Sequence, residues 1–114
     1  MKKILIVDDE EGILEVFQEI LGEAGHSITT VARSLEGLDL LRKGRFDLVI
    51  VDRKMPVKDG ADFVETLRQE RIPVKVLLIT GSPPEPLPSG IDGYLPKPCE
   101  MDRLLEMVKK LLGA

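Results

Sequence analysis

Short, nearly continuous apolar runs alternate with helical patterns along the whole sequence, and this alternation limits the fold more than any other feature. The runs are rich in Val, Ile and Leu, as are strands buried on both faces of a parallel sheet. Four runs stand out and a more polar fifth suits a sheet edge: 4–7, 46–51, 74–79, 91–95 and 27–31. Strands that alternate with helices predict a parallel sheet with right-handed crossovers and helices on both faces.

The segments between these runs have the periodicity of amphipathic helices. Helices are predicted over residues 13–24, 34–43, 59–71 and 100–112. Gly25 and Gly44 stand where the first two should end, Ser34 is a candidate N-cap, and Pro73 prevents the third from continuing. A length of 114 residues with no internal repeat or linker predicts one α/β domain over 1–114.

Composition and charge exclude several classes of partner. The net charge is -4 and the basic residues are scattered, so we expect no direct binding to nucleic acid. The apolar part of MKKILIVDDEE is too short for a signal peptide, and no run approaches the roughly 20 apolar residues of a membrane span. With a single cysteine, Cys99, these features predict a cytoplasmic protein that does not bind membranes.

Polar side chains follow four of the predicted strands at the point where each strand ends. Asp8 and Asp9 follow the first run, Asp52 and Thr80 follow the two central runs, and Lys97 follows the last. In open parallel sheets, ligands bind in the crevice outside the carboxyl ends of the strands. We therefore expect these five residues to meet at one rim of the sheet.

These residue types together favour phosphoryl transfer. Two carboxylates at ~4 Å repel by about 4 kcal/mol at an effective dielectric of about 20, and a hard divalent cation relieves this repulsion. Oxygen-only ligands point to Mg²⁺. Lys97 and Thr80 would add a positive charge and a hydroxyl donor beside a phosphoryl group. Taken singly, each residue has a plainer role: Asp8 and Asp9 could cap a helix, Asp52 could form a turn, and Lys97 could be solvated.

Four motifs in this order resemble the receiver domain of bacterial two-component response regulators. They are VDDEE at 7–11, DRKMPVKDG at 52–60, LLITG at 77–81 and YLPKP at 94–98. The resemblance covers essentially the whole chain. It implies a flavodoxin-like (CheY-like), doubly wound, five-stranded parallel sheet with strand order 2-1-3-4-5.

The resemblance also implies how the acidic residues act. Asp52 would accept a phosphoryl group from a sensor histidine kinase or a histidine phosphotransfer protein. Asp9 would bind Mg²⁺ directly and Asp8 through water, and Asp52 and the backbone carbonyl of Lys54 would complete the protein ligands. Such a domain supports its own phosphotransfer and dephosphorylation, and it is not an enzyme acting on outside substrates.

The remaining implied roles concern the switch. Thr80 and Lys97 would hold the phosphoryl oxygens, and Tyr94 would be the aromatic residue that changes position. The new charge on Asp52 would draw the loops at the strand ends inward and alter contacts with a downstream protein target.

The chain departs from the family between Thr80 and Lys97, where receivers have their fourth helix. Four prolines disfavour a helix there: Pro83, Pro84, Pro86 and Pro88. We expect this helix to be missing or reduced, and the loop 82–90 either stiffens the crossover or binds a partner in polyproline geometry. Many receivers pair through the face of the fourth helix, fifth strand and last helix, so we expect a monomer instead of that dimer.

Three other functions compete with this interpretation. A magnesium-dependent phosphatase would need a second carboxylate where Lys54 stands, and a nucleotide or flavin module would need a glycine-rich loop after the first strand. The third is a receiver-like protein-binding scaffold that is never phosphorylated. Both a stand-alone regulator and the receiver part of a longer chain are compatible with these motifs.

Overall fold

Five strands form one parallel sheet in the computed structural model, which describes residues 2–52, 60–81, 90–96 and 100–113. The sheet has the order β2-β1-β3-β4-β5, and every neighbouring pair is parallel. The strands are β1 (Lys3–Val7), β2 (Ser27–Val31), β3 (Leu48–Asp52), β4 (Lys75–Thr80) and β5 (Gly93–Pro96). The predicted doubly wound sheet and its strand order are confirmed.

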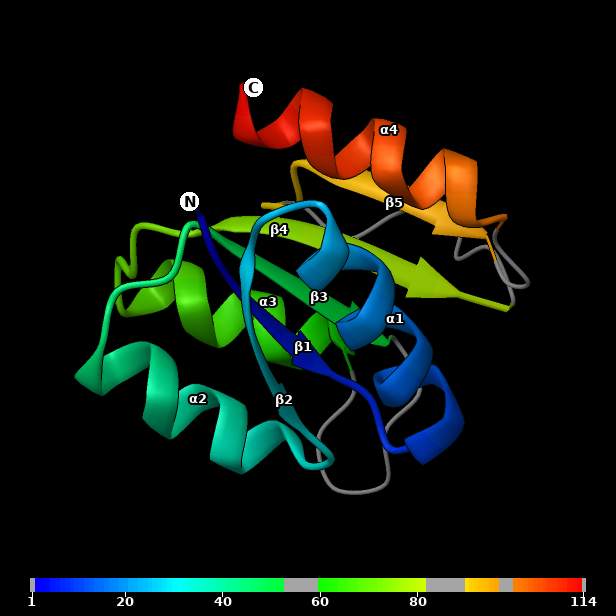
Figure 1. Cartoon of the computed structure of the whole chain (residues 1–114). Helices are drawn as coiled ribbons and strands as arrows, with labels where there is room; N and C mark the ends of the chain where they lie inside the picture. Colours follow the sequence, from blue (N-terminus) through cyan, green and yellow to red (C-terminus); the bar gives the residue numbers. More distant parts are fainter. Residues whose placement is uncertain (1, 53–59, 82–89, 97–99, 114) are drawn as a thin grey trace.

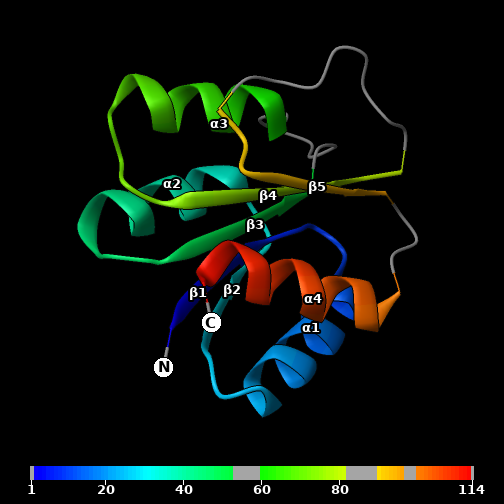
Figure 2. The ribbon, with the colours of Figure 1, turned by 90° about the horizontal axis from the view of Figure 1, so that it is seen from above.

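Helices cover both faces of this sheet, as Figure 2 shows. They are α1 (Glu11–Glu23), α2 (Ser34–Lys43), α3 (Gly60–Gln69) and α4 (Met101–Leu112). The pair α2 and α3 lies on one face, and the pair α1 and α4 lies on the other. No helix occurs between β4 and β5 among the residues described there, 81 and 90–92, while most of the predicted loop (82–89) lies outside the description.

Two apolar cores, one on each face, explain why the strand sequences are apolar without a break. Ile4 and Ile6 of β1 pack with α1 and α4, while Leu5 and Val7 of the same strand pack with α2 and α3. Strands β3 and β4 divide their side chains in the same way. The edge strand β2 is only partly buried, and this matches its polar sequence.

The helix ends show where local patterns predicted the chain well and where they did not. Gly25, with φ 95°, follows the C-cap residue of α1, Ala24, as a helix-ending glycine should. Ser34 is not an N-cap: Arg33 holds that position, and the buried Ser34 hydroxyl has no hydrogen-bond partner among the described residues. Helix α3 ends two residues before the predicted Arg71, because the backbone turns there at φ 56°.

An exposed ion pair joins α2 to Glu70, the residue that follows α3. Arg42 of α2 donates from Nε and Nη2 to the carboxylate of Glu70 at 2.7 and 2.6 Å. This hydrogen bond raises the pKa of Arg42 above its ordinary value, which by itself already keeps the guanidinium charged at physiological pH. Among the described helices, none has the length and apolar composition needed to cross a bilayer.

Candidate functional site

The strands bring the predicted site residues to the same edge of the sheet. In the ladder, Val7 of β1 is level with Val51 of β3, so Asp8 and Asp52 are the next residues on neighbouring strands. Asp52 is level with Ile79 of β4, which places Thr80 one residue further along. Figure 1 shows the strand arrows running in one direction toward this edge. The backbone thus brings together residues that are far apart in the sequence.

Asp8 lies deep at this edge and is held in a fixed orientation. Asp8 is 3% exposed, and its Oδ1 accepts a hydrogen bond of 3.0 Å from the backbone N–H of Glu10. Its own N–H donates to the carbonyl of Val31 at 3.1 Å. The next residue, Asp9, is exposed. The acidic pair therefore presents one oriented, buried carboxylate and one that is open to solvent.

The simpler interpretation of this acidic pair was that it caps the first helix. The N-cap position of α1 belongs to Glu10, with extended backbone angles, and no side chain there makes a capping hydrogen bond. Neither Asp8 nor Asp9 is therefore the N-cap residue. The contact between Asp8 and the Glu10 N–H instead fixes the turn that leads from β1 into the helix.

The two hydroxyl residues of the predicted switch lie on neighbouring strands. Thr80 is the last residue of β4 and is fully buried. Tyr94 is half-buried in β5, level with Leu78 of β4. At the end of this pair of strands, Thr80 is level with Pro96, which directly precedes Lys97 in the chain.

Part of the predicted site lies outside the description. The backbone of Asp52 closes β3, but its side chain is not described, and Lys54 and Lys97 belong to the undescribed residues. In the described part of the chain, no group of three or more His, Cys, Asp or Glu side chains is placed to hold a metal ion. The roles of Asp52, Lys54 and Lys97 therefore remain predictions.

A second group of polar contacts, at the opposite end of β4 and β5, was not predicted from the sequence. It centres on Arg68 of α3, which contacts Val74, Gly90 and Asp92. Two of these three partners contribute only a backbone carbonyl. Since every residue has such a carbonyl, the sequence carries little signal of this group beyond the glycine that follows the proline-rich stretch.

Comparison with known proteins gives concordant matches. Residues 4–109 match the family model described as the response regulator receiver domain. Response regulator MprA of Mycobacterium sp. (strain KMS) is 35% identical over 115 residues, which cover 96% of this chain and 50% of that protein. The alkaline phosphatase synthesis transcriptional regulatory protein PhoP of Bacillus subtilis (strain 168) is 32% identical over 116 residues, with 97% and 48% covered. The chain thus spans about half the length of the curated relatives it matches.

A solved structure resembles the chain over its full length. Response regulator protein TrrA from Thermotoga maritima, in complex with Mg(2+)-BeF, has a TM-score of 0.90 and 38% identity, and the match covers 98% of this chain and 100% of that one. The strand order, the buried aspartate after β1 and the matched family model all point to the same family. The chain belongs to the response regulator receiver domain family.

Proposed function

We propose that the 114 residues act as one phosphoacceptor receiver domain of a two-component phosphorelay. Asp52 accepts a phosphoryl group from a sensor histidine kinase or a histidine phosphotransfer protein in a magnesium-dependent reaction. One observation carries this proposal: the strand register puts the buried, oriented Asp8 next to Asp52, with the buried Thr80 at the same edge.

The donor set at this edge fits Mg²⁺. Asp8 and Asp9 offer only oxygen atoms, which hard divalent cations prefer, and the buried Asp8 carboxylate already has a fixed orientation. Asp9, Asp52 and the backbone carbonyl of Lys54 would bind the ion directly, and Asp8 would bind it through water. Bound there, Mg²⁺ would neutralise charge on the phosphoryl oxygens during transfer.

The chain's own side chains carry out the remaining chemistry. A carboxylate oxygen of Asp52 forms a bond to phosphorus while the phosphorus–nitrogen bond of the phosphohistidine breaks, and the electron pair returns to the imidazole nitrogen. The Thr80 hydroxyl and the Lys97 ammonium hold the phosphoryl oxygens. The negative charge that develops on these oxygens is thereby stabilised.

Phosphorylation then alters contacts with a downstream protein. The phosphoryl group itself carries about -1.5 to -2 charges, in place of the single charge of the carboxylate, and it brings new acceptor oxygens to Asp52. Reversing a two-state balance from about 1:99 to 99:1 requires about 5.5 kcal/mol, and a few charge-assisted hydrogen bonds of roughly 1.5–3 kcal/mol each supply this. Tyr94, half-buried on the strand beside Thr80, is the side chain proposed to follow this change.

The test is intact-mass spectrometry after incubation with acetyl phosphate, with and without Mg²⁺. We expect one magnesium-dependent phosphoryl addition to the wild-type chain and none to Asp52→Ala. Asp47→Ala is the matched control, because Asp47 lies before β3, at the opposite end from Asp52. No addition to the wild type, together with no binding of beryllofluoride, would reject the proposal and favour the scaffold that is never phosphorylated.

A further inference from the structure

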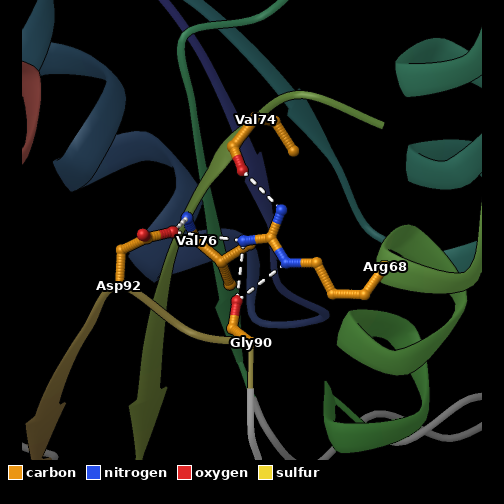
Figure 3. Close-up of polar contacts among 5 residues, drawn as sticks. All are labelled: Arg68, Val74, Val76, Gly90 and Asp92. Atoms are coloured by element: carbon orange, nitrogen blue, oxygen red, sulfur yellow. Dashed lines mark hydrogen bonds and ion pairs between the residues drawn. The ribbon is translucent and has the colours of Figure 1, made fainter. Parts of the chain in front are cut away.

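The side chain of Arg68 ties helix α3 to the starts of both β4 and β5 (Figure 3). Its Nη1 donates to the carbonyl of Val74 at 3.0 Å, just before β4 begins. Its Nε and Nη2 donate to the carbonyl of Gly90 at 2.9 and 2.6 Å. Nη2 also lies 3.2 Å from Oδ2 of Asp92, the residue that precedes β5. One planar guanidinium thus holds three points of the chain at fixed relative positions.

Asp92 connects this guanidinium to the sheet itself. Its Oδ2 accepts a hydrogen bond of 2.8 Å from the N–H of Val76, and its own N–H donates to the carbonyl of Val76 at 2.8 Å. The first ladder pair of the two strands, Leu77 with Gly93, follows directly. Asp92 therefore pairs with β4 through both backbone and side chain at the point where the register of β5 is set.

Gly90 permits the close approach that this arrangement needs. Its φ is 90°, and a Cβ atom at this position would lie 2.9 Å from Cγ of Arg68 and 3.4 Å from Cγ1 of Val64. Both neighbours belong to α3. The backbone of the connection thus passes so close to these two side chains that a larger residue would have to displace Arg68. We call Arg68, Gly90, Asp92 and the Val74 carbonyl the Arg68 latch.

The latch holds a connection in which few other described contacts fix the incoming strand. In a βαβ unit, the packing of the crossover helix on the sheet normally fixes where the next strand begins. Among residues 81 and 90–92 there is no helix, and Ile91 is the apolar residue there that packs on the core between the sheet and the α2–α3 pair. Strand β5 is also short, and it is an edge strand whose neighbour in the sheet is β4.

The register of β5 decides what reaches the opposite end of the strand. Tyr94 is level with Leu78, and Pro96, the residue before Lys97, is level with Thr80. A slip of one residue would turn every side chain of β5 to the other face of the sheet. We propose that Arg68 is a positioning residue for phosphoryl transfer. The Arg68 latch fixes β5 against β4 and thereby keeps Pro96, from which the chain continues to Lys97, level with Thr80. This inference rests on the proposed function.

A positioning role for Arg68 should affect acceptance of the phosphoryl group but not Mg²⁺ binding, because the two steps use residues from different strands. The proposed Mg²⁺ ligands lie at or after the ends of β1 and β3, whereas the residues proposed to hold the phosphoryl oxygens lie at or after the ends of β4 and β5. Loss of the latch should therefore leave Mg²⁺ affinity nearly unchanged and slow the acceptance of the phosphoryl group. A general loss of structure would weaken both steps.

The experiment compares Arg68→Ala, Arg68→Lys and a matched control, Arg42→Ala. Arg42 also bridges from a helix to a carboxylate on the same face of the protein, but it contacts Glu70 and Asp39 and not the β4–β5 connection. The Mg²⁺ dissociation constant is measured by calorimetry, and the initial rate with acetyl phosphate at saturating Mg²⁺ by intact mass. Amide hydrogen exchange at Val76 and Asp92 reports the latch directly.

We expect Arg68→Ala to exchange faster at both amides and to accept the phosphoryl group about tenfold to a hundredfold more slowly. Its Mg²⁺ affinity should stay within about twofold of the wild type. In Arg42→Ala, both the Mg²⁺ affinity and the rate of phosphoryl acceptance should stay within the same range. Arg68→Lys keeps the charge and one donor and should recover part of the rate. A wild-type rate in Arg68→Ala, an equal loss in Arg42→Ala, or a parallel loss of Mg²⁺ affinity would overturn the positioning role. An inactive wild type would instead reject the proposed function on which it rests.

Discussion

At the scale of single residues, the two adjacent aspartates after β1 differ because their surroundings differ. Asp8 is nearly fully buried and accepts the Glu10 N–H, while Asp9 is exposed. A buried, oriented carboxylate suits an outer ligand that positions water, and an exposed one can approach an ion directly. The division of roles proposed for this pair thus agrees with their burial.

The first prediction concerns the charge of Asp8. The substitution Asp8→Asn keeps an oxygen that can accept the Glu10 N–H but removes the negative charge. We expect Mg²⁺ affinity to fall by about tenfold to a hundredfold, the usual effect of losing a group that orients the inner ligands. Isothermal titration calorimetry with MgCl₂ measures this loss.

The matched control for this prediction is Asp47→Asn. Asp47 also accepts a backbone hydrogen bond, from the N–H of Lys3 at 2.8 Å, but it lies at the other end of the sheet. Its substitution should leave Mg²⁺ affinity as it is. If Asp8→Asn bound Mg²⁺ as tightly as the wild type, Asp8 would have no part in the metal site.

At the scale of elements, the connection from β4 to β5 contains a glycine, Gly90, that packs against helix α3. Gly90 has φ 90° and lies against Arg68 and Val64 of α3. Gly25, after α1, has nearly the same φ, 95°, but a Cβ there would meet nothing within 4 Å. The two glycines therefore separate the cost of the backbone conformation from the cost of the contact.

We predict that Gly25→Ala lowers the free energy of unfolding by about 1 kcal/mol, the cost of a left-handed conformation for alanine. Gly90→Ala should lower it by about 1–3 kcal/mol more, because the new methyl group would displace Arg68. Urea denaturation measures both values. In the Arg68→Ala background the extra loss at Gly90 should shrink, and equal losses at the two glycines would show that the contact relaxes freely.

These elements also show how far the sequence could predict the fold and the site. Strands β1, β3 and β4 were recognised because both their faces are buried, so their sequences are apolar throughout. The site edge was predicted because strand ends in a parallel sheet meet there, whatever the detail of the loops. Ser34 was misassigned because a serine near a helix start is equally compatible with the cap and with the first turn. Arg68 was missed because most of its acceptors are backbone carbonyls.

At the scale of the whole molecule, the part of the surface that the structure describes gives little reason for a stable pair. Among the described residues, the exposed large apolar side chains are Val16, 44% exposed, and Leu35, 54% exposed. Val16 lies on α1 and Leu35 on α2, and these helices cover opposite faces of the sheet (Figure 2). They therefore cannot form one continuous apolar patch of the kind that marks a protein interface.

The pairing known in many receivers uses a helix whose place is taken here by a proline-rich stretch. A specific interface buries about 1,200–2,000 Å² in total, and the prolines at 83–88 disfavour a helix that would contribute part of that area. We therefore predict that the chain is a monomer both alone and when loaded with Mg²⁺ and beryllofluoride. Sedimentation velocity over a range of concentrations measures the mass in each state, and Asp52→Ala, which should not bind beryllofluoride, is the control. A doubling of mass in the loaded wild type alone would contradict the prediction and would mean that activation creates a pairing surface that does not depend on that helix.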